Sequence, residues 1–237
     1  MSKRVARAVP SLLVKRGQRR TVVVTKALKD IRVQRGAHAT VVWIDDHGSG
    51  RRELSAALEQ DAAILWQIVT IGGKGERRIT THIEGVAASS TVEWTALAAN
   101  GDGVRLSVEN HFLGRQGSGE ITMRGVAAGT GKLACAGLIA VGPRAAGTDA
   151  YLTQDVLMLD ATAKVDAVPA LDIRTSDVKA SHSASVSRVQ PQDIFYLTSR
   201  GVPPDKARQL IVEGFLGELV ARLPKDARAA AMRSLRP

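Results

Sequence analysis

The 237-residue sequence is poor in cysteine, in aromatic residues and in long apolar runs, and each deficit excludes a class of protein. Its single cysteine, Cys135, cannot close an intramolecular disulfide or form a metal site made of cysteines alone. Only 3% of the residues are aromatic, which disfavours a sandwich core anchored by bulky rings. No apolar run approaches the ~20 residues of a membrane span, and the N-terminus does not resemble a secretory signal peptide. We therefore expect a cytoplasmic protein without a membrane partner.

The positive charge is concentrated at the N-terminus. Residues 1–35 contain eleven Lys and Arg and one acidic residue, whereas residues 36–237 contain 22 basic and 22 acidic residues. This distribution predicts a basic arm over residues 1–20 attached to a neutral body. Such an arm suits nucleic acid or an acidic surface. No aromatic residues interleave its basic residues, so nucleic acid is the less favoured partner.

Short runs of alternating apolar and polar residues fill residues 21–189 and predict an all-β core. In one run, Val104, Leu106 and Val108 share a face. Strand starts recur about every 11 to 16 residues, and small side chains occupy many inward positions, which favours a stacked β-solenoid over a sandwich. The pattern alone leaves an ordinary all-β domain open. Residues 53–61 are predicted to form a short helix or a loop.

Residues 190–237 change to a helical pattern and predict a small C-terminal helical domain. A short helix is expected over residues 192–199, with Gly201 just beyond its end, and a longer helix over residues 204–222. A short basic helix could follow.

The longer helix carries two apolar stripes, whereas an ordinary surface helix needs one. Ile211 and Phe215 belong to the first stripe, and Leu216, Val220 and Leu223 belong to the second. We predict that the first stripe packs on the preceding short helix and that the second is free for a partner.

The sequence contains no complete catalytic motif. The Gly-rich residues 125–132 do not match a phosphate-binding loop, because Val126 and Leu133 occupy positions that require Gly and Ser or Thr. The five histidines are dispersed, without Cys or carboxylate at metal-ligand spacing. These features indicate a non-enzymatic assembly or binding protein.

Three linked segments resemble the C-terminal signature of the SufB/SufD family. Residues 177–186 contain a strand ending in an H-x-A-S-V stretch, residues 193–202 contain FYL-x-SRG, and residues 207–215 match A-x-x-x-I-x-x-G-F. Weaker agreement extends over residues 20–223. The resemblance implies a right-handed parallel β-helix followed by a helical domain. It also implies a protein that acts with the ATPase SufC in building iron–sulfur clusters.

The resemblance also implies where cargo and partners bind. Iron or a transient iron–sulfur cluster would be shared with a partner, with His182 and Cys135 as candidate ligands and no intrinsic cofactor. The β-helix would pair with a SufB/SufD-like subunit, as a homodimer or a heterodimer, and the C-terminal helices would bind a SufC-like ATPase. The candidate partner-binding residues are Phe195, Tyr196, Arg200, Gly201, Ile211, Gly214, Phe215, Leu216 and Val220.

The chain departs from SufB where that subunit carries a cysteine and paired acids. Ala163 stands in the strand before Asp166, and Ser181 and Ser183 flank His182. Without these thiolate and carboxylate ligands, the resemblance favours a SufD-like, shortened member. The alternative interpretation is a basic-armed β-solenoid that binds nucleic acid or an acidic surface. An enzyme ranks third, because no nucleophile can be paired with a base.

Overall fold

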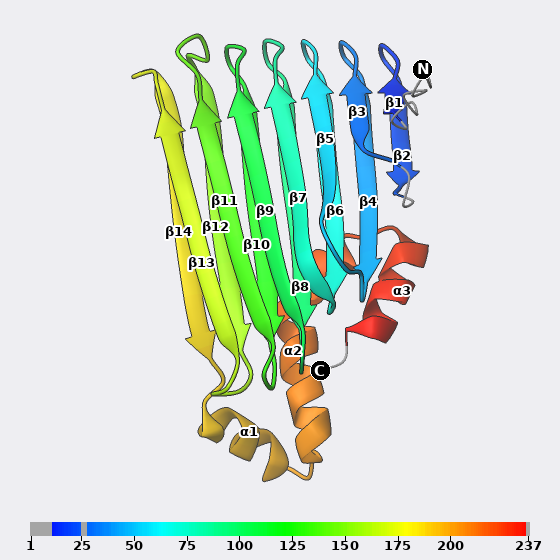
Figure 1. Cartoon of the computed structure of the whole chain (residues 1–237), viewed down its shortest axis with the longest axis vertical. Helices are drawn as coiled ribbons and strands as arrows, with labels where there is room; N and C mark the ends of the chain where they lie inside the picture. The colour runs from blue at the N-terminus through cyan, green and yellow to red at the C-terminus, as the bar shows by residue number, and fades with distance from the viewer. Residues whose placement is uncertain (1–10, 25–27, 236–237) are drawn as a thin grey trace, which may run out of the picture.

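A computed structural model describes residues 11–24 and 28–235, which form two sheets of seven parallel strands followed by three helices (Figure 1). Odd-numbered strands form sheet A and even-numbered strands form sheet B. The strands of sheet A are β1 (Ser11–Val14), β3 (Asp30–Val33), β5 (Arg52–Leu58), β7 (Lys74–Ile83), β9 (Gly103–Phe112), β11 (Lys132–Val141) and β13 (Lys164–Ile173). Those of sheet B are β2 (Arg19–Val23), β4 (His38–Asp46), β6 (Ala63–Ile71), β8 (Ser89–Ala98), β10 (Ser118–Ala127), β12 (Thr148–Met158) and β14 (Val178–Arg188).

Because the chain alternates between the sheets, each pair of consecutive strands forms one rung of a parallel β-helix. The rungs stack in register: Trp66 pairs with Val92, and Val92 pairs with Ile121. The predicted β-solenoid is therefore confirmed. The prediction for residues 53–61 was wrong, because Leu54, Ala56 and Leu58 alternate with more exposed residues along β5, as a strand requires.

The interior between the sheets is filled by the inward side chains of each rung. The three tryptophans, Trp43, Trp66 and Trp94, are all buried there. The Nε1–H of Trp66 donates a hydrogen bond to Thr81 Oγ1 (3.1 Å), and that of Trp94 donates to Thr70 Oγ1 (3.0 Å). The three tryptophans are thus used inside the β-helix; two of them have their Nε1–H hydrogen-bonded, whereas Nε1 of Trp43 has no partner among the described residues.

The interior also holds an ion pair. Arg77 is fully buried and donates from Nε to the carboxylate of Asp45, which is also buried and also binds Arg52. Arg77 Nη1 donates to the carbonyl oxygen of Gly50 (2.8 Å). A buried charge of this kind is tolerated only when it is paired and hydrogen-bonded.

Turns along one edge of the β-helix repeat a single conformation. In each turn a residue with positive φ donates its N–H to a carbonyl of the next rung, as Gly36 does to Gln60 (2.9 Å) and Ala87 does to Arg115 (3.0 Å). Gly17 and Gly147 occupy equivalent places, but Ala87 adopts φ +56° with a Cβ atom present. The left-handed conformation therefore carries a steric cost at Ala87 that glycine avoids.

The helices are α1 (Pro191–Thr198), α2 (Pro204–Ala221) and α3 (Lys225–Ser234), close to their predicted positions. Gly201, with φ +85°, follows α1 as expected for a residue that ends a helix. In Figure 1, α2 and α3 lie across the lower part of the strands, and α2 contacts β8 and β10 while α3 contacts β4. No helix in the described part of the chain is long and apolar enough to cross a membrane.

The predicted basic arm overlaps the first rung, because β1 begins at Ser11 and β2 at Arg19. Residues 1–10 lie outside the described residues. The described basic residues of the predicted arm are all exposed: Lys15, Arg16, Arg19 and Arg20.

We predict that Ala87→Gly stabilises the protein by about 0.5–1 kcal/mol, because glycine removes the steric cost of positive φ. The matched control is Ala88→Gly, since Ala88 is buried and lacks positive φ. This substitution should lower stability by removing a packed methyl group. The free energies of unfolding from urea titrations test both variants, and a stability loss for Ala87→Gly would contradict the argument.

Candidate partner-binding surfaces

Helix α2 packs against the outer face of sheet B through the stripe that was predicted to be free. Leu216 and Val220 are each 1% exposed, and Leu223 is also buried. They join one apolar cluster with sheet residues such as Leu97 and Val126. The predicted assignment of helix faces is therefore wrong, because this stripe covers the β-helix of its own chain.

The other stripe does not pack as predicted either. Ile211 and Phe215 are half-buried and lie against the same cluster on sheet B. Phe195 and Tyr196 of α1 are 71% and 56% exposed, so the first stripe does not cover them. Helix α2 lies along the surface of sheet B, so the apolar residues on both sides of its line of contact are covered by the sheet. Both apolar stripes therefore pack on the same surface.

Ion pairs at three points along α2 hold it on the β-helix. Arg222 contacts Glu93 (2.8 Å), Glu218 contacts Arg124 (2.8 Å), and Arg208 contacts Asp160 (2.6 Å). Asp160 also accepts the N–H of Gly129 (2.6 Å). The Arg208 guanidinium holds the pKa of Asp160 below its ordinary value, so this carboxylate is charged at neutral pH.

The sequence contained a signal for this docking that we did not use. Near their C-terminal ends, the even-numbered strands contain consecutive apolar residues, such as Ile68 with Val69 and Val126 with Ala127. These pairs interrupt the apolar–polar alternation expected of a sheet that is buried on one face only. Neighbouring apolar residues on a strand point to opposite faces, so both faces must be covered. One face lines the β-helix interior, and the C-terminal helices cover the other.

Helix α1 presents the clearest exposed aromatic surface. None of its residues is buried; Phe195 and Tyr196 are exposed on it, and exposed Arg200 follows just beyond its end. The Arg200 guanidinium lies 3.8 Å from the centre of the Tyr196 ring, in a cation–π contact. Together with exposed Leu210 on α2, these residues define what we call the α1 surface. Gly201 and Gly214 are also exposed.

The second surface is the C-terminal end of the β-helix, formed by β13 and β14. In the described part of the chain these strands are the last of their sheets, and each pairs on one side only. Their inward residues have no further rung above them, and Ile173 and Val186 are 40% and 49% exposed. We call this surface the open end. Long exposed edge strands are templates for pairing with another chain.

His182 belongs to the open end. It pairs with Leu152 on β12, which in turn pairs with Ile121 on β10, so it continues a column of interior side chains but is itself exposed. The structure therefore places His182 where a second chain could contact it.

Cys135 lies elsewhere, in the interior on β11, paired with Leu106 and Ala167. Burial raises the pKa of its thiol to about 12, so the thiolate needed for metal binding is not formed at neutral pH. No group of three or more His, Cys, Asp or Glu residues in the described residues is arranged to hold a metal ion. The structure thus does not combine His182 and Cys135 in a metal centre.

We predict that Leu216→Ala lowers the free energy of unfolding by about 2–4 kcal/mol, because it leaves a cavity between α2 and sheet B. Leu210→Ala on the same helix is the matched control. Leu210 is 40% exposed, so its truncation should change stability by less than about 1 kcal/mol. Urea denaturation of both variants tests this, and equal losses would contradict the docking of α2.

Comparison with known proteins assigns the chain to a family. Residues 11–215 match the sequence model described as SUF system FeS cluster assembly, SufBD core domain. An iron–sulfur cluster assembly SufBD family protein of Mycobacterium leprae is 31% identical over 72% of this chain and 20% of its own length. A second SufBD family protein, from Mycobacterium tuberculosis, is 31% identical over 81% of this chain and 51% of its own length. The chain spans between about a fifth and about half the length of these relatives. Because the core-domain model matches most of the chain, the chain belongs to the SufBD family of iron–sulfur cluster assembly proteins.

Proposed function

We propose that the chain is an assembly subunit of a SufBCD-type complex. In this proposal the open end pairs with a second SufB- or SufD-like subunit, the α1 surface binds a separate SufC-like ATPase, and iron or a nascent cluster is the cargo. The chain itself supplies a scaffold and no catalytic centre. Family membership supports the role in iron–sulfur cluster assembly, and the two surfaces support the contacts.

The open end carries the pairing proposal. Its two edge strands, β13 and β14, expose unpaired backbone groups that can pair with another strand, beside apolar side chains whose burial would be favourable. Pro169 within β13 cannot donate a ladder hydrogen bond, so β14, which has no proline, offers the uninterrupted edge for pairing. A like subunit with the same open end would cover both sheets at once.

The position of His182 supports a role for this junction in handling cargo. Its imidazole could act as one ligand at the junction of two paired subunits. The remaining ligands would come from the partner, because Ser181 and Ser183, which flank His182, lack thiolate and carboxylate groups. This arrangement fits a SufD-like role.

We predict that Val186→Arg weakens pairing at least about tenfold, because it places a charge in the apolar part of the open end. Val23→Arg is the matched control: Val23 is 66% exposed on β2, an edge strand of the first rung at the opposite end. Sedimentation equilibrium of the chain, alone and with a SufB-like subunit, measures the association. Unaltered pairing by Val186→Arg, with wild-type circular dichroism, would contradict the proposal.

The α1 surface carries the proposal for the ATPase. Aromatic residues and arginine dominate the binding energy of many interfaces, and here Phe195 and Tyr196 are exposed on α1, with Arg200 against the Tyr196 ring. We expect the double variant Phe195→Ala/Tyr196→Ala to capture a SufC-like ATPase at least about tenfold more weakly, with an unchanged melting temperature. Met232→Ala, an exposed apolar residue of α3, should bind as the wild type does. ATPase binding by the double variant at wild-type strength would remove α1 from the interface.

A further inference from the structure

The outer face of sheet A carries two histidines on neighbouring rungs. His82 on β7 is the register partner of His111 on β9, and the imidazole centres lie 5.3 Å apart with 25° between the ring planes. Inward residues of these strands fill the core, whereas His82 and His111 face outward and are half-buried. The pair is therefore within reach of solvent and is held by the backbone register, which fixes the spacing between the rungs.

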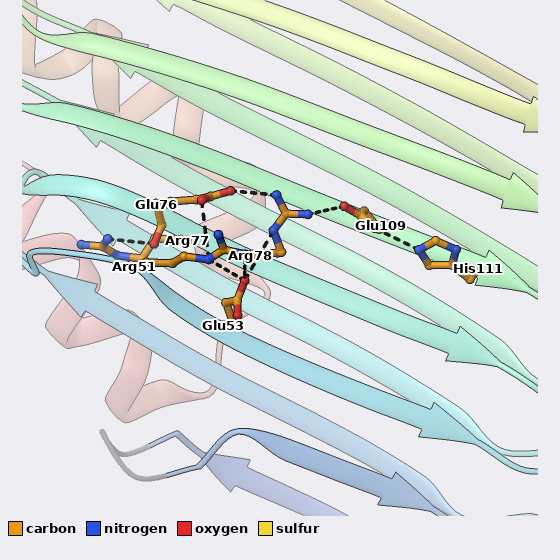
Figure 2. A network of polar contacts seen from close by, with 7 residues as sticks. All are labelled: Arg51, Glu53, Glu76, Arg77, Arg78, Glu109 and His111. Carbon is orange, nitrogen blue, oxygen red and sulfur yellow. Dashed lines mark hydrogen bonds and ion pairs between the residues drawn. The ribbon is translucent and has the colours of Figure 1, made fainter. Parts of the chain in front are cut away.

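A second observation concerns the orientation of His111. Its Nε2 lies 2.9 Å from a carboxylate oxygen of Glu109 and donates a hydrogen bond to it in the neutral tautomer. Glu109 is bound in turn by Arg78, which also donates to Glu76 (2.9 Å) (Figure 2). This chain of contacts holds the Nε2 proton on the carboxylate side and leaves Nδ1 of His111 with a lone pair for a ligand. Metal-binding histidines are commonly oriented by a carboxylate in this way.

We propose that His82 and His111 form a two-imidazole binding site for a divalent transition-metal ion on the outer face of sheet A, with Glu109 as the positioning residue. Imidazole nitrogen suits Zn²⁺, Cu²⁺, Ni²⁺ and Fe²⁺, whereas Mg²⁺ prefers oxygen ligands. With His111 held by Glu109, rotation of the His82 ring about χ2 would let one nitrogen of each imidazole bind the same ion, and water would complete its coordination. With two protein ligands the ion is exchangeable rather than structural.

This site is independent of the proposed function. His82 and His111 lie on β7 and β9, in the middle of sheet A, whereas His182 lies on β14, the last strand of sheet B. Failure to bind metal at β7 and β9 would leave the pairing at the open end untouched, so the two proposals fail separately.

The test is a titration of the full chain with Zn²⁺ alone. Calorimetry should give one site that His82→Ala or His111→Ala weakens at least tenfold, and that Glu109→Gln weakens several-fold through loss of orientation. His38→Ala is the matched control, because His38 is exposed on β4 in the other sheet, and this variant should bind Zn²⁺ as the wild type does. Mg²⁺ should not bind at the site.

NMR of the wild-type imidazoles provides a readout that does not depend on the folding of any variant. Under the proposal, one equivalent of Zn²⁺ shifts the resonances of His82 and His111 together. Binding of Zn²⁺ by both alanine variants at wild-type strength would overturn the proposal. So would a Zn²⁺ titration that leaves either imidazole unshifted, which would identify the pair as a stacked contact without a metal.

Discussion

The parallel hydrogen-bond ladder between successive rungs is the constraint on which this structure depends. Each strand pairs in register with the strand one rung away, so every interior side chain rests on the equivalent side chain of its neighbours. The turns obey the same repeat, because a positive-φ residue such as Gly36 or Ala87 donates its N–H to the next rung. Stability therefore comes from neighbours along the stack, as in other solenoids.

A stack of this kind creates its functional surfaces where the repeat stops. Inner rungs are covered on both sides, but among the described residues β13 and β14 are each paired on one side only, which leaves the open end with His182 at its surface. The C-terminal helices use their own apolar residues on sheet B, so α2 is anchored and α1 extends with its aromatic residues exposed. The ladder also aligns side chains on the outer faces, and it brings His82 beside His111.

Local signals in the sequence were enough to predict much of the fold. Alternating residues such as Val104, Leu106 and Val108 predicted strands, and Gly201 marked the end of α1. Contacts between rungs could not be predicted in the same way, because the register depends on turn lengths that vary along the chain. The pairing of His82 with His111 and the docking of Leu216 on sheet B both depend on that register.

Hydrogen exchange of the β14 backbone amides, followed as the chain is concentrated and as a SufB-like subunit is added, tests whether the open end pairs with another subunit. We predict that amides on the outer edge of β14 exchange quickly in the dilute chain and slow strongly when a like subunit pairs with the open end. The inner strands β8 and β10, already paired on both sides, should not change. Outer-edge amides of β14 that exchange equally fast in every sample would contradict a pairing role for the open end.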